Sequence, residues 1–228
     1  MKLAALFTGG KDSTYAIYLA KQQGHEVVGL ITIKSENPYS YMFHTPAIEL
    51  TALQAEALGL PLITGYTKGK KEEELVDLEK VIKKAKKELN FEGLITGALF
   101  SEYQSSRIMK IAQKLGVEVV SPLWHKPQEK EMQELLDLGF KFILTAVAAE
   151  GLTKDWLGKV ITKEDFAKLK QLNKKIGFHL SFEGGEAESL VLDCPLFKQK
   201  LIIEKFTVKE ENKYTARLIV KKARLEEK

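Results

Sequence analysis

The stretch Thr8-Gly9-Gly10-Lys11-Asp12-Ser13 decides the fold that we expect for this chain. It follows an apolar run, residues 3–7, and precedes a segment, residues 15–19, with apolar residues at helical spacing. This order is typical of a strand, a glycine turn and a helix. The paired glycines allow the backbone to approach a ligand closely. The N–H groups of the turn and the positive end of the helix then face one space, which suits a phosphate.

The side chains of the stretch fit the same chemistry. Lys11 adds a mobile positive charge, Ser13 adds a hydroxyl, and Asp12 can bind the N–H groups of its own loop or a Mg²⁺ ion. The alternative interpretation is an ordinary tight turn that Asp12 or Ser13 caps. The spacing differs from G-x-x-x-x-G-K-[ST] and from G-x-G-x-x-G, which mark two other kinds of phosphate-binding loop.

The composition is that of a soluble enzyme. The 228 residues suffice for one large domain or two small ones. The net charge of +4 fits anionic ligands without requiring nucleic acid. No apolar run reaches the roughly 18 residues of a membrane span, and the start lacks a signal-peptide pattern. The single cysteine, Cys194, excludes an internal disulfide, so we expect a cytoplasmic protein with no membrane partner.

Strand and helix patterns alternate over the first half of the chain, which predicts an α/β domain at residues 1–124. We expect a five-stranded parallel sheet with flanking helices. The strands are predicted at residues 2–7, 27–33, 62–64, 93–96 and 117–121, and the helices at residues 13–23, 45–59, 71–89 and 103–115. After Pro122 the rhythm changes and predicts a smaller α+β domain at residues 125–228. Its edge strands leave pairing across a homodimer open.

Ligands of parallel sheets bind beyond the carboxyl ends of the strands, where the loops at residues 8–13, 35–44 and 97–107 are predicted to lie. Arg107 can pair with a carboxylate or a phosphate through a two-bonded fork, or it is a surface arginine. Tyr103 is more typical of a core or rim aromatic than of a ligand contact.

A second polar constellation surrounds Gly184 and Gly185 in the smaller domain. Glu183, Glu186 and Glu188 crowd around these glycines, and carboxylates so close repel one another unless a cation lies among them. The turn could hold ammonium, Mg²⁺ or a positively charged substrate group. The alternative is a solvated acidic turn.

Residues 8–13 resemble the PP-loop of the N-type ATP pyrophosphatases, with Thr8 in place of the usual Ser. Further motifs follow in order at residues 40–45, 97–107, 151–159 and 183–197. Together they resemble the diphthine–ammonia ligase family over nearly the whole chain. This resemblance implies an adenine nucleotide alpha hydrolase-like (HUP) domain followed by a smaller domain. It implies an ATP-dependent ligase that converts diphthine on translation elongation factor 2, with ammonium, to diphthamide, AMP and pyrophosphate through an adenylated carboxylate.

The resemblance and the loop chemistry together assign the expected site residues. The ATP-binding residues are Thr8, Gly9, Gly10, Lys11, Asp12, Ser13 and Gly97. The catalytic residues are Lys11, Asp12, Ser13, Glu183 and Glu186. The substrate-binding residues are Ser40, Tyr103, Gln104, Arg107, Glu183, Gly184, Gly185, Glu186 and Glu188. Mg²⁺ is expected to arrive with ATP, with Asp12 as a candidate protein ligand, and no dedicated metal site is expected.

The chain departs from the family pattern at the acidic turn. Family members often have Gly where this chain has Phe182, and Tyr-Glu-Thr where it has Ala187-Glu188-Ser189. Other functions of a PP-loop protein are adenylation of another substrate and non-catalytic sensing of adenine nucleotides. Thiolation of transfer RNA generally uses a pair of cysteines or a metal cluster, and this chain has only Cys194.

Overall fold

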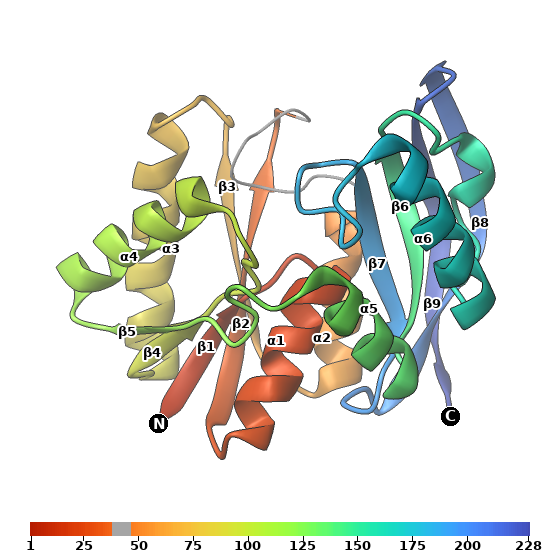
Figure 1. Cartoon of the computed structure of the whole chain (residues 1–228). Coiled ribbons are helices and arrows are strands. Elements are labelled where there is room, and N and C mark those ends of the chain that lie inside the picture. Colours follow the sequence, from red (N-terminus) through yellow and green to blue (C-terminus); the bar gives the residue numbers. More distant parts are fainter. Residues whose placement is uncertain (38–46) are drawn as a thin grey trace. The chain divides into compact units, whose positions relative to one another are not determined.

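The computed structural model describes residues 1–37 and 47–228. Its internal contacts divide the chain into two compact units, Met1–Trp124 and His125–Lys228. Each unit is built on a sheet of its own (Figure 1). No helix of the described residues is long and apolar enough to span a membrane.

The sheet of the first unit is parallel and has five strands. They are β1 (Lys2–Leu6), β2 (Glu26–Ser35), β3 (Leu62–Thr67), β4 (Gly93–Ile95) and β5 (Glu118–Val120). The strand order is β3-β2-β1-β4-β5, and Leu3 of β1 lies opposite both Val27 and Gly93. The chain order reverses between β1 and β4, so the loops that follow these strands diverge from a common point. Ligands of doubly wound sheets bind at such a point.

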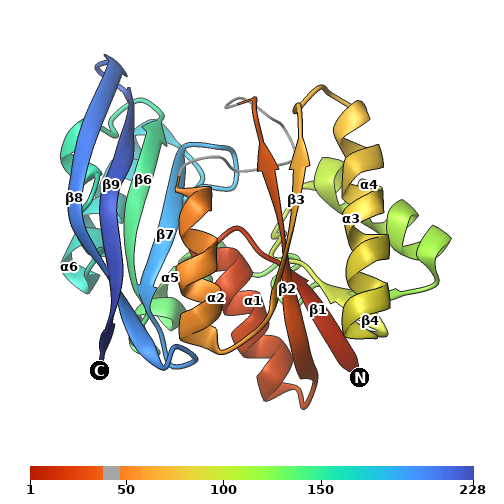
Figure 2. The same cartoon turned by 180° about the vertical axis from the view of Figure 1, so that it is seen from behind.

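Four α-helices cover the two faces of this sheet. They are α1 (Lys11–Gln22), α2 (Thr51–Leu58), α3 (Glu73–Leu89) and α4 (Glu102–Leu115), and a short 3-10 turn, η1 (Ile48–Leu50), leads into α2. Figure 1 and Figure 2 show α3 and α4 on one face and α1 and α2 on the other. Leu78, Ile82 and Ala85 form a buried stripe at helical spacing on α3, which packs on the strands. The predicted fold class is confirmed.

The sheet of the second unit is antiparallel and has four strands in the order β7-β6-β9-β8. These are β6 (Lys141–Ala148), β7 (Ala187–Asp193), β8 (Gln199–Asn212) and β9 (Thr215–Glu227). The helices α5 (Gln128–Asp137) and α6 (Lys163–Ile176) lie on one face of it, as both views show, and η2 (Lys154–Trp156) is a short 3-10 turn. Phe142 of β6 and Phe166 of α6 are buried in the core of this unit.

The largest differences from the prediction lie at the boundaries of four elements. Helix α1 begins at Lys11 rather than Ser13, because Gly10 takes the extended N-cap conformation. The helix expected from residue 45 becomes α-helical only at Thr51, and residues 45 and 46 lie outside the described residues. Strands β8 and β9 continue past residues 208 and 221, where the sequence predicts strands 200–208 and 214–221 to end, and form a long two-stranded ribbon.

Candidate active site

The loop between β1 and α1 requires glycine at its first turn. Gly9 has a φ of 78°, and a Cβ atom added there would lie 2.1 Å from Oε1 of Gln54. Gln54 is fully buried in α2, and its Nε2 donates a hydrogen bond of 2.9 Å to the carbonyl oxygen of Gly9. This contact was not predicted from the sequence. A polar side chain in the otherwise mostly apolar segment 51–58 was the available signal.

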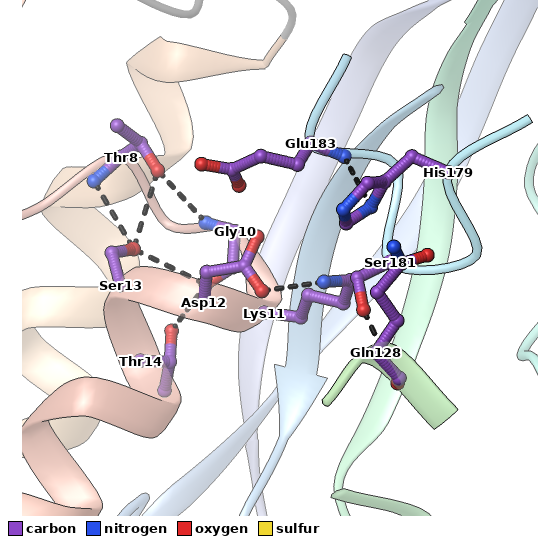
Figure 3. Close-up of polar contacts among 10 residues, drawn as sticks. All are labelled: Thr8, Gly10, Lys11, Asp12, Ser13, Thr14, Gln128, His179, Ser181 and Glu183. Carbon is purple, nitrogen blue, oxygen red and sulfur yellow. Dashed lines mark hydrogen bonds and ion pairs between the residues drawn. The ribbon is translucent and has the colours of Figure 1, made fainter. Parts of the chain in front are cut away.

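Hydroxyl groups close the same loop on itself (Figure 3). The backbone N–H of Thr8 donates to Oγ of Ser13 at 3.3 Å, and the two hydroxyl oxygens lie 3.2 Å apart. The N–H of Gly10 donates to Oγ1 of Thr8 at 3.4 Å. Gly10 caps α1 without a side-chain hydrogen bond. A helix start of this kind presents backbone N–H groups and positive partial charge, which suits an anion.

Lys11 and Asp12 form an ion pair within the first turn of α1. The side chain of Lys11 is 1% exposed and that of Asp12 is 29% exposed. The ammonium group of Lys11, expected to be a mobile charge, is buried here against the carboxylate of its neighbour. Asp12 is the more accessible member of the pair.

Gly97, which follows β4, lies directly against the start of α1. A Cβ atom added to Gly97 would lie 2.8 Å from both the carbonyl carbon of Asp12 and the backbone nitrogen of Ser13. Nearby, the N–H of Ala98 donates to Oγ1 of Thr96 at 3.1 Å and fixes the bend after the strand. The structure thus brings Gly97 together with residues 8–13, and its role there is to permit close backbone packing.

Tyr103 and Arg107 meet on α4 and share a partner, Glu72, at the start of α3. The guanidinium carbon of Arg107 lies 3.5 Å from the centroid of the Tyr103 ring. Oε1 of Glu72 lies 2.5 Å from Nη2 and 3.2 Å from Nε of Arg107, and accepts a 3.3 Å hydrogen bond from the Tyr103 hydroxyl. The hydrogen bond from Arg107 lowers the pKa of Glu72, while burial raises the pKa of Tyr103.

The two-bonded fork of Arg107 is therefore engaged by a carboxylate of its own chain. Glu72 lies 35 positions before Arg107, and no local pattern links the two, so sequence reasoning missed it. Gln104 lies in the same turn, where its N–H donates to the capping hydroxyl of Ser101 at 3.3 Å.

The acidic turn before β7 is held by its own backbone. The N–H of His179 donates to Oε1 of Glu186 at 2.8 Å. The N–H of Glu183 donates to Nδ1 of His179 at 3.4 Å, as Figure 3 shows. The other carboxylate oxygen of Glu186 is buried and has no hydrogen-bond partner among the described residues. Gly185 has a φ of 83°, as the turn requires, and Glu188 belongs to β7, opposite Ala146. His179 is a third residue, after Gln54 and Glu72, whose contact the sequence did not predict.

Phe182 occupies a left-handed backbone position with a φ of 66°. This is the position at which the resembled family often has glycine, the residue that adopts such a φ most readily. Phe182 is 6% exposed, and its ring stacks on Phe178 with centroids 6.2 Å apart. Packing of the ring therefore offsets the strain of the backbone.

Two further expectations concern metal binding and Cys194. Within residues 1–37 and 47–228, no group of three or more His, Cys, Asp and Glu side chains is arranged to bind a metal ion. Burial raises the pKa of the Cys194 thiol to about 11, which suits an inert thiol rather than a nucleophile.

Ser40, predicted to bind substrate, lies outside the described residues.

Sequence comparisons match both units. The family profile described as diphthamide synthase N-terminal domain matches residues 1–119, and the profile described as diphthamide synthase C-terminal domain matches residues 127–225. The diphthine–ammonia ligase of Bos taurus is 35% identical over 223 residues, which cover 90% of this chain and 83% of that protein. The one from Homo sapiens is 34% identical with the same coverage. The one from Schizosaccharomyces pombe is 36% identical over 89% of this chain, but over 36% of that protein. These matches confirm the resemblance that the motifs predict.

Proposed function

The chain belongs to the diphthamide synthase family, and from this premise we propose that it is a diphthine–ammonia ligase. The reaction uses ATP and ammonium to convert the carboxylate of diphthine on translation elongation factor 2 into the amide of diphthamide. AMP and pyrophosphate are released. This chemistry belongs in the cytoplasm, where the translation factor acts.

The ATP-binding part of the proposal rests on the start of α1, where the N-cap residue makes no side-chain hydrogen bond. The loop places two glycines, two hydroxyl groups and the first N–H groups of a helix around one space. We assign the triphosphate of ATP to residues 8–13, with Gly97 allowing the two backbones to approach. Asp12 supplies a partly exposed carboxylate for the Mg²⁺ ion that accompanies ATP, because carboxylate oxygen is a preferred ligand of that ion.

The same loop would activate the acceptor carboxylate, because it holds the pyrophosphate that leaves ATP. When the acceptor carboxylate attacks the α-phosphorus, negative charge accumulates on the departing pyrophosphate. Preorganised N–H donors and the Lys11 ammonium stabilise that charge, and one such donor is typically worth about 10²–10³ in rate. Lys11 is suited to this role because its side chain is already held beside the loop.

The acidic turn is proposed to serve the second half of the reaction, in which ammonia attacks the adenylated carboxylate. The carboxylates of Glu183 and Glu186 hold ammonium through their negative charge, and one of them accepts its proton to give ammonia. Glu186 is kept in place by the N–H of His179, which leaves its buried second oxygen for a cation. Gly184 and Gly185 shape the turn and Glu188 adds charge at its end.

The test is the release of AMP and pyrophosphate with a diphthine-bearing acceptor, ammonium, ATP and Mg²⁺. The Lys11→Ala variant is expected to lose about 10²–10³ in rate while keeping its fold. Lys21→Ala, in the last turn of the same helix, is the matched control and is expected to react at the wild-type rate. Wild-type turnover in Lys11→Ala would contradict the assignment of the loop, and a mere nucleotide sensor would release neither product.

A further inference from the structure

Glu72, Tyr103 and Arg107 form a compact cluster in which an anion, an aromatic face and a cation meet. The guanidinium stacks on the ring and binds the carboxylate, and the tyrosine hydroxyl binds the same carboxylate oxygen. Lys71 lies at the edge of this cluster, with Nζ 5.8 Å from the ring centroid. In the free protein, the carboxylate of Glu72 therefore binds both Arg107 and Tyr103.

A solute can reach both charged groups of the cluster. The side chain of Arg107 is 24% exposed and that of Glu72 is 55% exposed. Glu72 also has a φ of 68°, an unusual conformation for a residue other than glycine. Strained residues of this kind cluster at ligand sites, where the surrounding structure keeps them in place.

The charges decide which class of ligand can open the cluster. A simple anion that takes Arg107 leaves Glu72 without its partner, and a simple cation that takes Glu72 leaves Arg107 without its partner. Either exchange gains one ion pair and loses another, so it brings little net attraction. A zwitterion replaces one ion pair by two and leaves neither group unpaired. The guanidinium of Arg107 lies over the Tyr103 ring in the free protein. When it turns to the carboxylate of the ligand, the ring adds a preference for a methylated ammonium, because aromatic rings attract quaternary ammonium ions.

We propose that the Glu72–Tyr103–Arg107 cluster binds the zwitterionic head group of the acceptor. Arg107 takes the carboxylate, and Glu72 and Tyr103 take the neighbouring trimethylammonium group. This inference rests on the proposed function, since it assigns the acceptor of that reaction to residues of the first unit. Glu72 is thereby a specificity-determining residue, and the ion pair of the free protein imitates the bound head group.

Glycine betaine, acetate and choline are the probes of this site, because they carry both charges, the negative charge and the positive charge respectively. Binding is measured on the full chain from the NMR signals of the Tyr103 ring and the Arg107 Nε–H group. We expect glycine betaine to bind at least about tenfold more tightly than acetate or choline. Equal binding of acetate and glycine betaine would overturn the proposal.

Two variants separate the cluster from an ordinary surface ion pair. Glu72→Gln removes the negative charge at the cluster, and Glu79→Gln removes it from the Glu79–Lys114 pair, which also links α3 and α4, at 2.6 Å. Glu72→Gln is expected to abolish the preference for glycine betaine and to raise the KM for the acceptor protein about tenfold, with kcat changed less than about twofold. Glu79→Gln is expected to change neither quantity.

The opposite sign of the KM effect would also overturn the proposal. If Glu72 only blocked Arg107, Glu72→Gln would lower the KM for the acceptor. Equal effects of Glu72→Gln and Glu79→Gln on ligand preference and KM would show that the cluster is an ordinary surface ion pair. Failure of the proposed function is distinguishable, because wild-type protein would then release no AMP, whereas the binding of glycine betaine is measured without turnover.

Discussion

Gly97 is the residue at which the phosphate loop depends most directly on another strand. An added methyl group would lie 2.8 Å from two backbone atoms of α1, which cannot move as a side-chain tip can. Gly97→Ala is therefore expected to displace the start of α1, to raise the KM for ATP about tenfold or more, and to cost about 1–3 kcal/mol of stability. Steady-state kinetics and thermal unfolding measure the two effects.

Gly93, at the other end of β4, is the matched control. Its added methyl group would lie 2.8 Å from Cδ2 of Leu3, a side-chain tip, far along the strand from the loop. Gly93→Ala should lower the midpoint of thermal unfolding while the KM for ATP stays as in the wild type. A normal KM in Gly97→Ala would show that the loop does not depend on this packing.

At Phe182 an unfavourable left-handed backbone conformation is combined with favourable packing of a buried ring. Removing the buried ring costs about 3–5 kcal/mol, and the left-handed position costs a residue other than glycine about 1–2 kcal/mol. Glycine recovers the second quantity and alanine does not. Phe182→Ala should therefore be less stable than Phe182→Gly by about 1 kcal/mol, even though glycine is usually the worse replacement.

Phe178 provides the comparison, because its ring stacks on Phe182 while its own φ is not among the positive ones. At Phe178 the glycine variant should be the less stable of the two. Urea unfolding of the four variants gives the order directly. The same order at both positions would mean that the turn relaxes and carries no strain.

At the scale of elements, α6 has the best defined start. Thr162 caps the helix and Asp165 completes a capping box. Burial raises the pKa of Asp165, but hydrogen bonds from Lys159 and Thr162 outweigh burial and hold the pKa below its ordinary value of 3.8. Because the folded pKa is depressed, the charged carboxylate stabilises the fold above pH 3.8, and this contribution is lost as the pH falls through the folded value.

Asp165→Asn should therefore be less stable than the wild type by about 1 kcal/mol at pH 7, and the difference should vanish at pH values below the folded pKa. Urea unfolding at both pH values measures it. Asp155→Asn makes the same charge change in η2, outside any capping box, and should leave the stability nearly unchanged at pH 7. A difference that persisted in acid would contradict the electrostatic origin of the effect.

Periodicity explains which elements the sequence could reveal. Apolar repeats predicted the helices of the first unit, because each helix buries one apolar stripe. Continuous apolar runs predicted its strands, because the central strands are buried on both faces. The ends of β8 and β9, residues 209–212 and 222–227, were missed because these residues are mostly exposed and bury no apolar face. Pairing with β9, rather than a buried face, holds that ribbon.

At the scale of the whole molecule, the fold class followed from strands alternating with helices, whereas the partners of the site residues did not. Gln54, Glu72 and His179 lie 45, 35 and 7 positions from the groups they bind. Their contacts exist only once the elements have packed. The sequence indicated which loops converge on the sheet edge, and only the packed structure shows that Arg107 is engaged by a carboxylate of its own chain.

The most direct measurement follows nitrogen from ¹⁵N-labelled ammonium into the acceptor. Wild-type protein is incubated with labelled ammonium, ATP, Mg²⁺ and elongation factor 2 that carries diphthine, and mass spectrometry of the modified histidine is compared with the AMP released. The expected result is one labelled amide for each AMP, absent without ATP. Release of AMP with no labelled amide, or an acceptor whose mass is unchanged, would contradict the proposed ligase activity.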